Sequence, residues 1–218
     1  MQMLLQETEY NLMAFGEIPD RPLHISVQPL SINEEFLGGS AILKHLQMQP
    51  EFENGITSLP FSVIIPKSHI PCPAIVIIVE EKEINDNAME WVSKGYAVFY
   101  LCHSDISVNN GNFKSGISAY ISPSRRKKSS AGKIAVWAWA AIRVLEYAEV
   151  LYEIDRNKIG IAGEGIFGLS AVLADKYCDN FSFVSPTNLP KIDKEFVLSN
   201  PHIFSPEFAK KPCFDNNN

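Results

Sequence analysis

The fold of this chain is decided by the stretch Ile161-Ala162-Gly163-Glu164-Gly165-Ile166-Phe167-Gly168. It closes a short apolar segment, Lys158–Ala162, that predicts a strand, and it leads into Leu169–Lys176, which predicts a helix. Its glycines predict a tight turn at which the strand and the helix approach closely. A strand, a glycine turn and a helix in this order are typical of a parallel sheet covered by helices.

The segments around this turn extend the same pattern. Ala74–Val79 and Tyr96–Leu101 are continuous apolar runs, which predicts strands buried on both faces. Further elements are expected as strands at Leu23–Val27, Ala41–Met48, Phe61–Ile65 and Phe181–Val184, and as a helix at Asp86–Lys94. We therefore predict an α/β fold: one domain over residues 1–218, with a mostly parallel central sheet, an antiparallel N-terminal edge, and residues 1–22 as an arm.

Ala131–Glu153 predicts the longest helix. One stripe at helical spacing is apolar and contains Ile134, Trp137 and Leu145, whereas Lys133 and Arg143 fall outside it. The preceding segment, His103–Ser130, predicts a long loop that contains the basic run Arg125-Arg126-Lys127-Lys128. We interpret this run as a solvated loop, with a phosphate or nucleic-acid contact as the alternative. Asp155-Arg156-Asn157 predicts the turn before the next strand.

Composition limits the classes of function. The 218 residues carry a formal net charge of -6, which argues against nucleic acid or an anionic membrane as the main partner. The four cysteines (Cys72, Cys102, Cys178 and Cys213) form no CxxC pair, so we expect neither a metal site nor a disulfide framework. The N-terminus resembles no signal peptide, so we expect a cytoplasmic protein, and we expect no cofactor.

Two known motifs share the strand–turn–helix geometry of the glycine turn. One is the nucleophile elbow, G-x-S-x-G, which raises a serine above the sheet edge. The other is the dinucleotide fingerprint, G-x-G-x-x-G, which Gly163, Gly165 and Gly168 match literally. That fingerprint requires an acidic residue at the end of the next strand, and here the strand ends Val184-Ser185-Pro186. Nucleotide or anion binding at this turn is therefore an alternative and not the main hypothesis.

Most of the chain resembles, in order, the glucuronoyl esterases and the related acetyl xylan esterase-like hydrolases. The resemblance is carried by Trp91–Val98 with Asp105-Ile106, Ile134–Ala140 with Arg143–Tyr147, Glu153–Gly163, and Asn200–Phe204 with Glu207–Lys210. It implies an α/β-hydrolase-like sandwich and a serine ester hydrolase acting on carbohydrate esters. It also implies a C-terminally truncated version of that domain. A truncated sheet would expose an edge that a partner, such as a second copy of the chain, would cover.

The resemblance also implies that the catalytic residues are lost. The family's elbow has a serine followed by an arginine that supports the oxyanion, and these positions are Gly165 and Ile166 here. Glu164 replaces the usual cysteine or histidine, and the helix dipole would hold it as an ionised cap. His202 is the only histidine after the turn, and it does not match the family's catalytic histidine. The vestigial elbow is thus Gly163, Glu164, Gly165, Ile166, Phe167 and Gly168, with no intact catalytic residue.

Three residues could in principle rescue catalysis. Ser170 falls inside the predicted helix, where its hydroxyl is expected to bond its own backbone. Ser104 and Asp105 follow a strand but have no placed histidine to act as a base. We therefore expect a non-catalytic relative of the carbohydrate esterases that binds a carbohydrate or small-molecule ester. An active hydrolase with a non-standard nucleophile remains an alternative.

Overall fold

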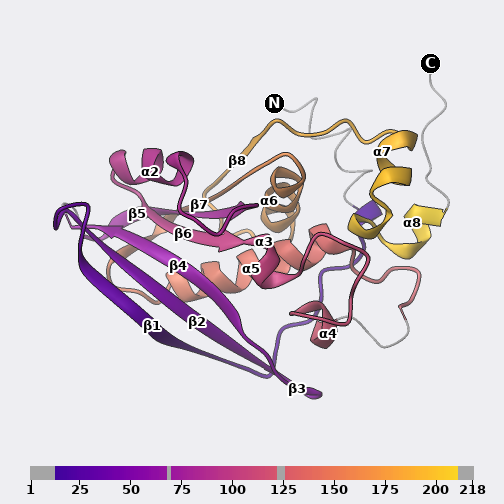
Figure 1. Ribbon diagram of the computed structural model, residues 1–218, viewed down its shortest axis with the longest axis horizontal. Coiled ribbons are helices and arrows are strands. Elements are labelled where there is room, and N and C mark those ends of the chain that lie inside the picture. Colours follow the sequence, from indigo (N-terminus) through magenta and orange to yellow (C-terminus); the bar gives the residue numbers. More distant parts are fainter. Residues whose placement is uncertain (1–12, 68–69, 122–125, 211–218) are drawn as a thin grey trace.

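The computed structural model describes residues 13–67, 70–121 and 126–210 of the 218. These residues form one mixed sheet with helices on both faces (Figure 1). Its strands are β1 (His24–Phe36), β2 (Ala41–Phe52), β3 (Gly55–Ile56), β4 (Leu59–Pro66), β5 (Cys72–Val79), β6 (Ala97–Cys102), β7 (Ile154–Glu164) and β8 (Phe183–Thr187). The helices are α2 (Asp86–Ser93), α3 (His103–Ile106), α4 (Ser118–Ile121), α5 (Lys133–Ala148), α6 (Ile166–Tyr177), α7 (Lys194–Ser199) and α8 (Pro206–Lys210), with short 3-10 turns η1 (Met13–Phe15) and η2 (Pro201–Ile203).

The strand order is β1-β2-β4-β6-β5-β7-β8, and β3 pairs with β2. The pairs from β1 to β6 are antiparallel, whereas β6, β5, β7 and β8 run parallel. The predicted α/β sheet with an antiparallel N-terminal edge is therefore confirmed. The antiparallel part is longer than predicted because β1 and β2 continue to Phe36 and Phe52.

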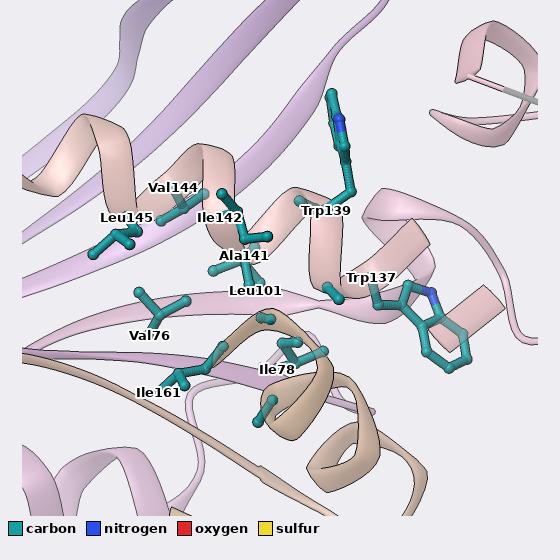
Figure 2. Packing of buried hydrophobic residues seen from close by; sticks show 14 of the residues in the cluster. Val76, Ile78, Leu101, Trp137, Trp139, Ala141, Ile142, Val144, Leu145 and Ile161 are labelled. Carbon is teal, nitrogen blue, oxygen red and sulfur yellow. The ribbon is translucent and has the colours of Figure 1, made fainter. Parts of the chain in front are cut away.

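Both faces of the sheet are buried, as the apolar run in β5 predicts. Ala74, Val76 and Ile78 face one core and Ile75 and Ile77 the other. The first core lies under α5 and α6, and the second lies under α2. Figure 2 shows side chains of the sheet, Val76, Leu101 and Ile161 among them, packed beneath α5. Burying one such aliphatic side chain contributes about 1.5–3 kcal/mol.

Helix α5 differs from the prediction because two polar residues outside its apolar stripe, Lys133 and Arg143, are buried too. Lys133 is 0% exposed and Arg143 is 6% exposed. Arg143 forms an ion pair with Glu146 at 3.1 Å, while the Lys133 ammonium donates to oxygens of the preceding loop. These two residues lie off the predicted apolar stripe, yet they are buried. The helix also ends at Ala148, earlier than the predicted Glu153.

Two other expectations about local structure were wrong. Asp155–Asn157 does not turn the chain, because β7 already begins at Ile154, beside Cys72 of β5. The segment His103–Ser130 is not wholly loop, since α3 and α4 lie within it. In its basic run, Arg126 lies over the Phe113 ring at 3.7 Å and donates to the Ala131 carbonyl, so this arginine is not simply solvated. Arg125 lies outside the described residues.

The two ends of the described chain meet each other. Phe15, in the predicted N-terminal arm, is fully buried and stacks on Phe204 with ring centroids 5.4 Å apart. Residues 1–12 and Cys213 lie outside the described residues. Strand β8 is the last strand of the described sheet on its parallel side, and cover of this edge by a partner stays a prediction. Every helix of the described residues is too short or too polar to cross a lipid bilayer.

Candidate functional site

The glycine turn joins β7 to α6 and places Gly165 at its tip. Gly165 has φ 57° and ψ -125°, a conformation that strains any residue with a Cβ atom. A Cβ built on Gly165 would meet no atom of the described chain within 4 Å. The turn therefore has the strand-to-helix geometry of a nucleophile elbow, with open space where the nucleophile would stand. Glycine adopts this backbone without strain, but it has no group that can attack a carbonyl.

The neighbouring glycines bring the strand and the helix together. A Cβ on Gly163 would lie 2.4 Å from the carbonyl oxygen of Phe167, and one on Gly168 would lie 2.9 Å from the carbonyl oxygen of Gly163. Backbone atoms in a tight turn cannot move aside as a flexible side chain can. The predicted close approach is thus observed. Packing alone explains why glycine is needed at these positions, and no phosphate ligand has to be invoked.

A cavity of about 450 Å³ opens beside this turn. It lies at the carboxyl ends of β5 and β7. The next strand in the chain after β5, β6, pairs with one side of β5, whereas β7 pairs with the other side, so the strand order reverses between β5 and β7. Ligands of open α/β sheets bind at such a switch point. The lining residues are Ile77, Ile78, Val79, Glu80, Glu81, Asn85, Asn87, Asn109 and the turn residues Gly163, Glu164, Gly165, Ile166 and Phe167.

The side chains of this lining limit its chemistry. Three are carboxylates (Glu80, Glu81 and Glu164), three are amides, and the rest are glycine or apolar. Within the described residues, no serine, cysteine, threonine, histidine, lysine or arginine lines the cavity. Hydrolysis by a covalent acyl-enzyme needs a nucleophile and a base within hydrogen-bond reach of each other. The lining can hold a ligand through hydrogen bonds but does not offer this pair.

Glu164 has a different partner from the one expected. Its Oε1 accepts a hydrogen bond of 2.7 Å from Nδ2 of Asn188, which follows β8. The N-cap of α6 is Gly165, and no side chain of the described residues caps the helix there. The expectation that Glu164 caps this helix was therefore wrong. Its carboxylate instead ties the turn to the loop after β8.

The three rescue candidates all have structural partners. The Ser170 hydroxyl donates to the carbonyl oxygen of Ile166 at 3.4 Å, the backbone bond expected for a serine inside a helix. Ser104 lies 3.1 Å from the Cys102 sulfur, and Asp105 forms an ion pair with Lys82 at 2.5 Å. None of the three lines the cavity in the described chain.

His202 lies nearer to the cavity than the sequence suggested. Its Nε2 is 2.7 Å from Oδ1 of Asn109, and the Asn109 side chain lines the cavity. Burial lowers the pKa of His202, and the positive charge of Lys133 lowers it further. No local pattern indicates this pair, because 93 positions separate the two residues. His202 is thus connected to the cavity lining through Asn109.

A buried polar cluster around Lys133 lies outside the cavity lining. The Lys133 ammonium donates to Ser107 Oγ at 2.5 Å, to the Asn112 carbonyl oxygen at 2.6 Å and to Ser118 Oγ at 3.4 Å. Burial lowers the pKa of Lys133 to about 8. A lysine beside a serine can form a nucleophile pair, but Ser107, Ser118 and Lys133 are each at most 2% exposed and lie outside the cavity lining. The cluster therefore holds the loop before α5 in place, and an ester in solvent cannot reach its hydroxyl groups.

Solved structures with the same fold support the sequence resemblance. A glucuronoyl esterase from Solibacter usitatus matches 96% of this chain and 67% of its own, with TM-score 0.78 and 18% identity. The match to a family 15 carbohydrate esterase, the glucuronoyl esterase from Teredinibacter turnerae, covers 94% of this chain and 59% of that esterase, with TM-score 0.75 and 17% identity. The match to a Bacteroides fragilis protein named as an acetyl xylan esterase covers 84% of this chain and 51% of that protein, with TM-score 0.52 and 13% identity.

These likenesses establish the α/β-hydrolase-like fold. The chain spans about three fifths to two thirds of the length of the two glucuronoyl esterases. No protein-family model matches the sequence, and no curated protein matches it either.

Proposed function

We propose that this chain is a non-catalytic relative of the carbohydrate esterases that binds a carbohydrate or another small ligand beside Gly165. One observation carries the proposal: the residue at the tip of the elbow has the backbone of a nucleophile position, φ 57° and ψ -125°, and no side chain. The next residue, Ile166, cannot donate a side-chain hydrogen bond to an oxyanion. Two contributions to ester hydrolysis are missing from adjacent positions.

The solved structures support a carbohydrate as the ligand. Those with the same fold are named as glucuronoyl esterases and as an acetyl xylan esterase, both of which act on carbohydrates. The lining supports binding without reaction, because its amides and carboxylates suit hydroxyl groups, while the described chain places no hydroxyl or thiol nucleophile and no histidine or lysine there. A change from catalysis to binding preserves the fold and the cavity, since neither depends on the serine.

The two alternatives have less support. An active hydrolase that uses another serine would need a reachable hydroxyl beside a base, and the Ser107–Lys133 pair is buried. Nucleotide binding at Gly163–Gly168 would place a pyrophosphate among the carboxylates of Glu80, Glu81 and Glu164. Both alternatives therefore conflict with a feature of the described site.

Labelling with a fluorophosphonate probe tests whether the chain holds an activated serine. We expect no labelling of the native chain above that of a heat-denatured sample, because glycine occupies the nucleophile position of the elbow. An active serine hydrolase treated in the same tube verifies the probe. Stoichiometric labelling of the native chain, mapped to one serine by peptide mass spectrometry, would refute the proposal.

A further inference from the structure

The cavity beside Gly165 carries negative charge that nothing in its lining compensates. Glu80, Glu81 and Glu164 contribute three carboxylates, and no basic side chain lines the cavity in the described residues. Asn188 donates to one Glu164 oxygen, but an amide carries no net charge. Their summed potential reaches a ligand in this cavity, since its walls lie well within the screening length of physiological salt.

The positive charges around the cavity are too few to balance its three carboxylates. Lys82 follows Glu81 in the chain, but its ammonium is paired with Asp105 at 2.5 Å. Lys133 is fully buried outside the lining, and it donates to neutral oxygens of Ser107, Asn112 and Ser118, so it contributes a single positive charge. The N-terminus of α6 offers the equivalent of about half a positive charge. Three full negative charges exceed this half charge and the one positive charge of Lys133 together, so the cavity is expected to repel anions.

We infer that the cavity selects sugars without a negative charge and excludes carboxylated sugars. The inference rests on the proposed function and deepens it by naming the ligand class. A sugar bearing a protonated amine should bind best, a neutral sugar less well, and a uronic acid worst. The carboxylates accept hydrogen bonds from hydroxyl or ammonium groups, whereas a uronate would bring a fourth carboxylate into the same space.

The amides complete the recognition of a polyol. Asn85 Oδ1 accepts from the Ala88 backbone N–H at 3.1 Å, and Asn109 Oδ1 is held by His202. The Nδ2 groups of Asn85 and Asn109 are therefore the parts that can donate to a ligand. Donating amides next to accepting carboxylates match hydroxyl groups, which both accept and donate. Among the described residues, no three or more His, Cys, Asp or Glu side chains form a group that could hold a metal ion.

Binding of three matched sugars tests this inference. Methyl glucosaminide, methyl glucoside and methyl glucuronoside share one ring and differ in charge, and their affinities are measured by ligand-observed NMR at low salt. We expect the amino sugar to bind at least about fivefold more tightly than the uronic acid, with the neutral sugar between them. Added salt should narrow this difference, because it screens the carboxylates.

Variants identify the cavity as the source of the preference. Replacing Glu80, Glu81 and Glu164 together by glutamine removes the three charges and keeps their size, so the preference should fall to within about twofold. The control replaces Glu34 and Glu35 by glutamine. Both are exposed on β1 and outside the cavity lining, so the ranking of the three sugars should stay unchanged.

Three outcomes overturn the inference: no sugar binds, the uronic acid binds best, or the ranking survives the triple substitution. These outcomes are independent of the labelling experiment, because binding preference and nucleophile reactivity are measured separately. Labelling with the expected ranking would refute only the non-catalytic role.

Discussion

Replacing Gly132 by alanine is expected to lower the free energy of unfolding by about 3 kcal/mol. Gly132 precedes α5, and its N–H donates to the Phe15 carbonyl oxygen at 2.7 Å. A Cβ at this position would lie 2.2 Å from the carbonyl oxygen of Ile203 and 2.6 Å from the carbonyl carbon of Phe204. Backbone is packed on backbone here, so the N-terminal segment, α5 and η2 would have to separate. Urea unfolding followed by circular dichroism measures the loss.

Gly111→Ala is the matched control for this substitution. A Cβ on Gly111 would meet no described atom within 4 Å, and the residue is exposed. Its effect is expected to stay within about 0.5 kcal/mol. Equal unfolding midpoints for Gly132→Ala and Gly111→Ala would contradict the close packing of Gly132 against the backbone of Ile203 and Phe204.

The stability of the chain is expected to rise with pH through the titration of Lys133. Burial lowers the pKa of Lys133 from 10.5 to about 8. Below pH 8 the folded and unfolded states both bind the proton, and the full cost of the buried charge is present. Between pH 8 and 10.5 the unfolded chain binds more of this proton, so the free energy of unfolding rises with pH. The pKa difference corresponds to about 3 kcal/mol over this range.

A comparison with Lys133→Met isolates this effect from other titrating groups. The difference in unfolding free energy between the wild type and Lys133→Met should grow in favour of the wild type by about 3 kcal/mol from pH 8 to 10.5. Lys114→Met removes an exposed lysine from the same region and should give a flat difference. Parallel profiles for the wild type and Lys133→Met would contradict a buried ammonium at this position.

The sheet and the turn could be predicted because local patterns determine them. The apolar run of β5 reflects burial on both faces, and the turn needs glycine because backbone atoms lie 2.4 Å from a Cβ built on Gly163. Neither feature depends on a distant part of the chain. The same holds for Ser170, whose backbone bond follows from its place in a helix.

The features of the site that were missed depend on contacts between distant segments. Lys133 is polar and lies off the apolar stripe of its helix, but Ser107, Asn112 and Ser118 surround its ammonium with acceptors. His202 is associated with the cavity only through Asn109, which precedes it by 93 residues. A periodic pattern records which face of an element is apolar, and it does not record which loop folds over the polar face.

Ester hydrolysis by the purified chain tests the central claim most directly. The substrates are a glucuronoyl methyl ester and p-nitrophenyl acetate, and the double variant Gly165→Ser with Ile166→Arg is assayed beside the wild type. We predict buffer-level rates for both proteins, because no histidine of the described chain lines the cavity to activate a new serine. Saturable hydrolysis by the wild type, abolished by one substitution in the cavity lining, would contradict a non-catalytic role.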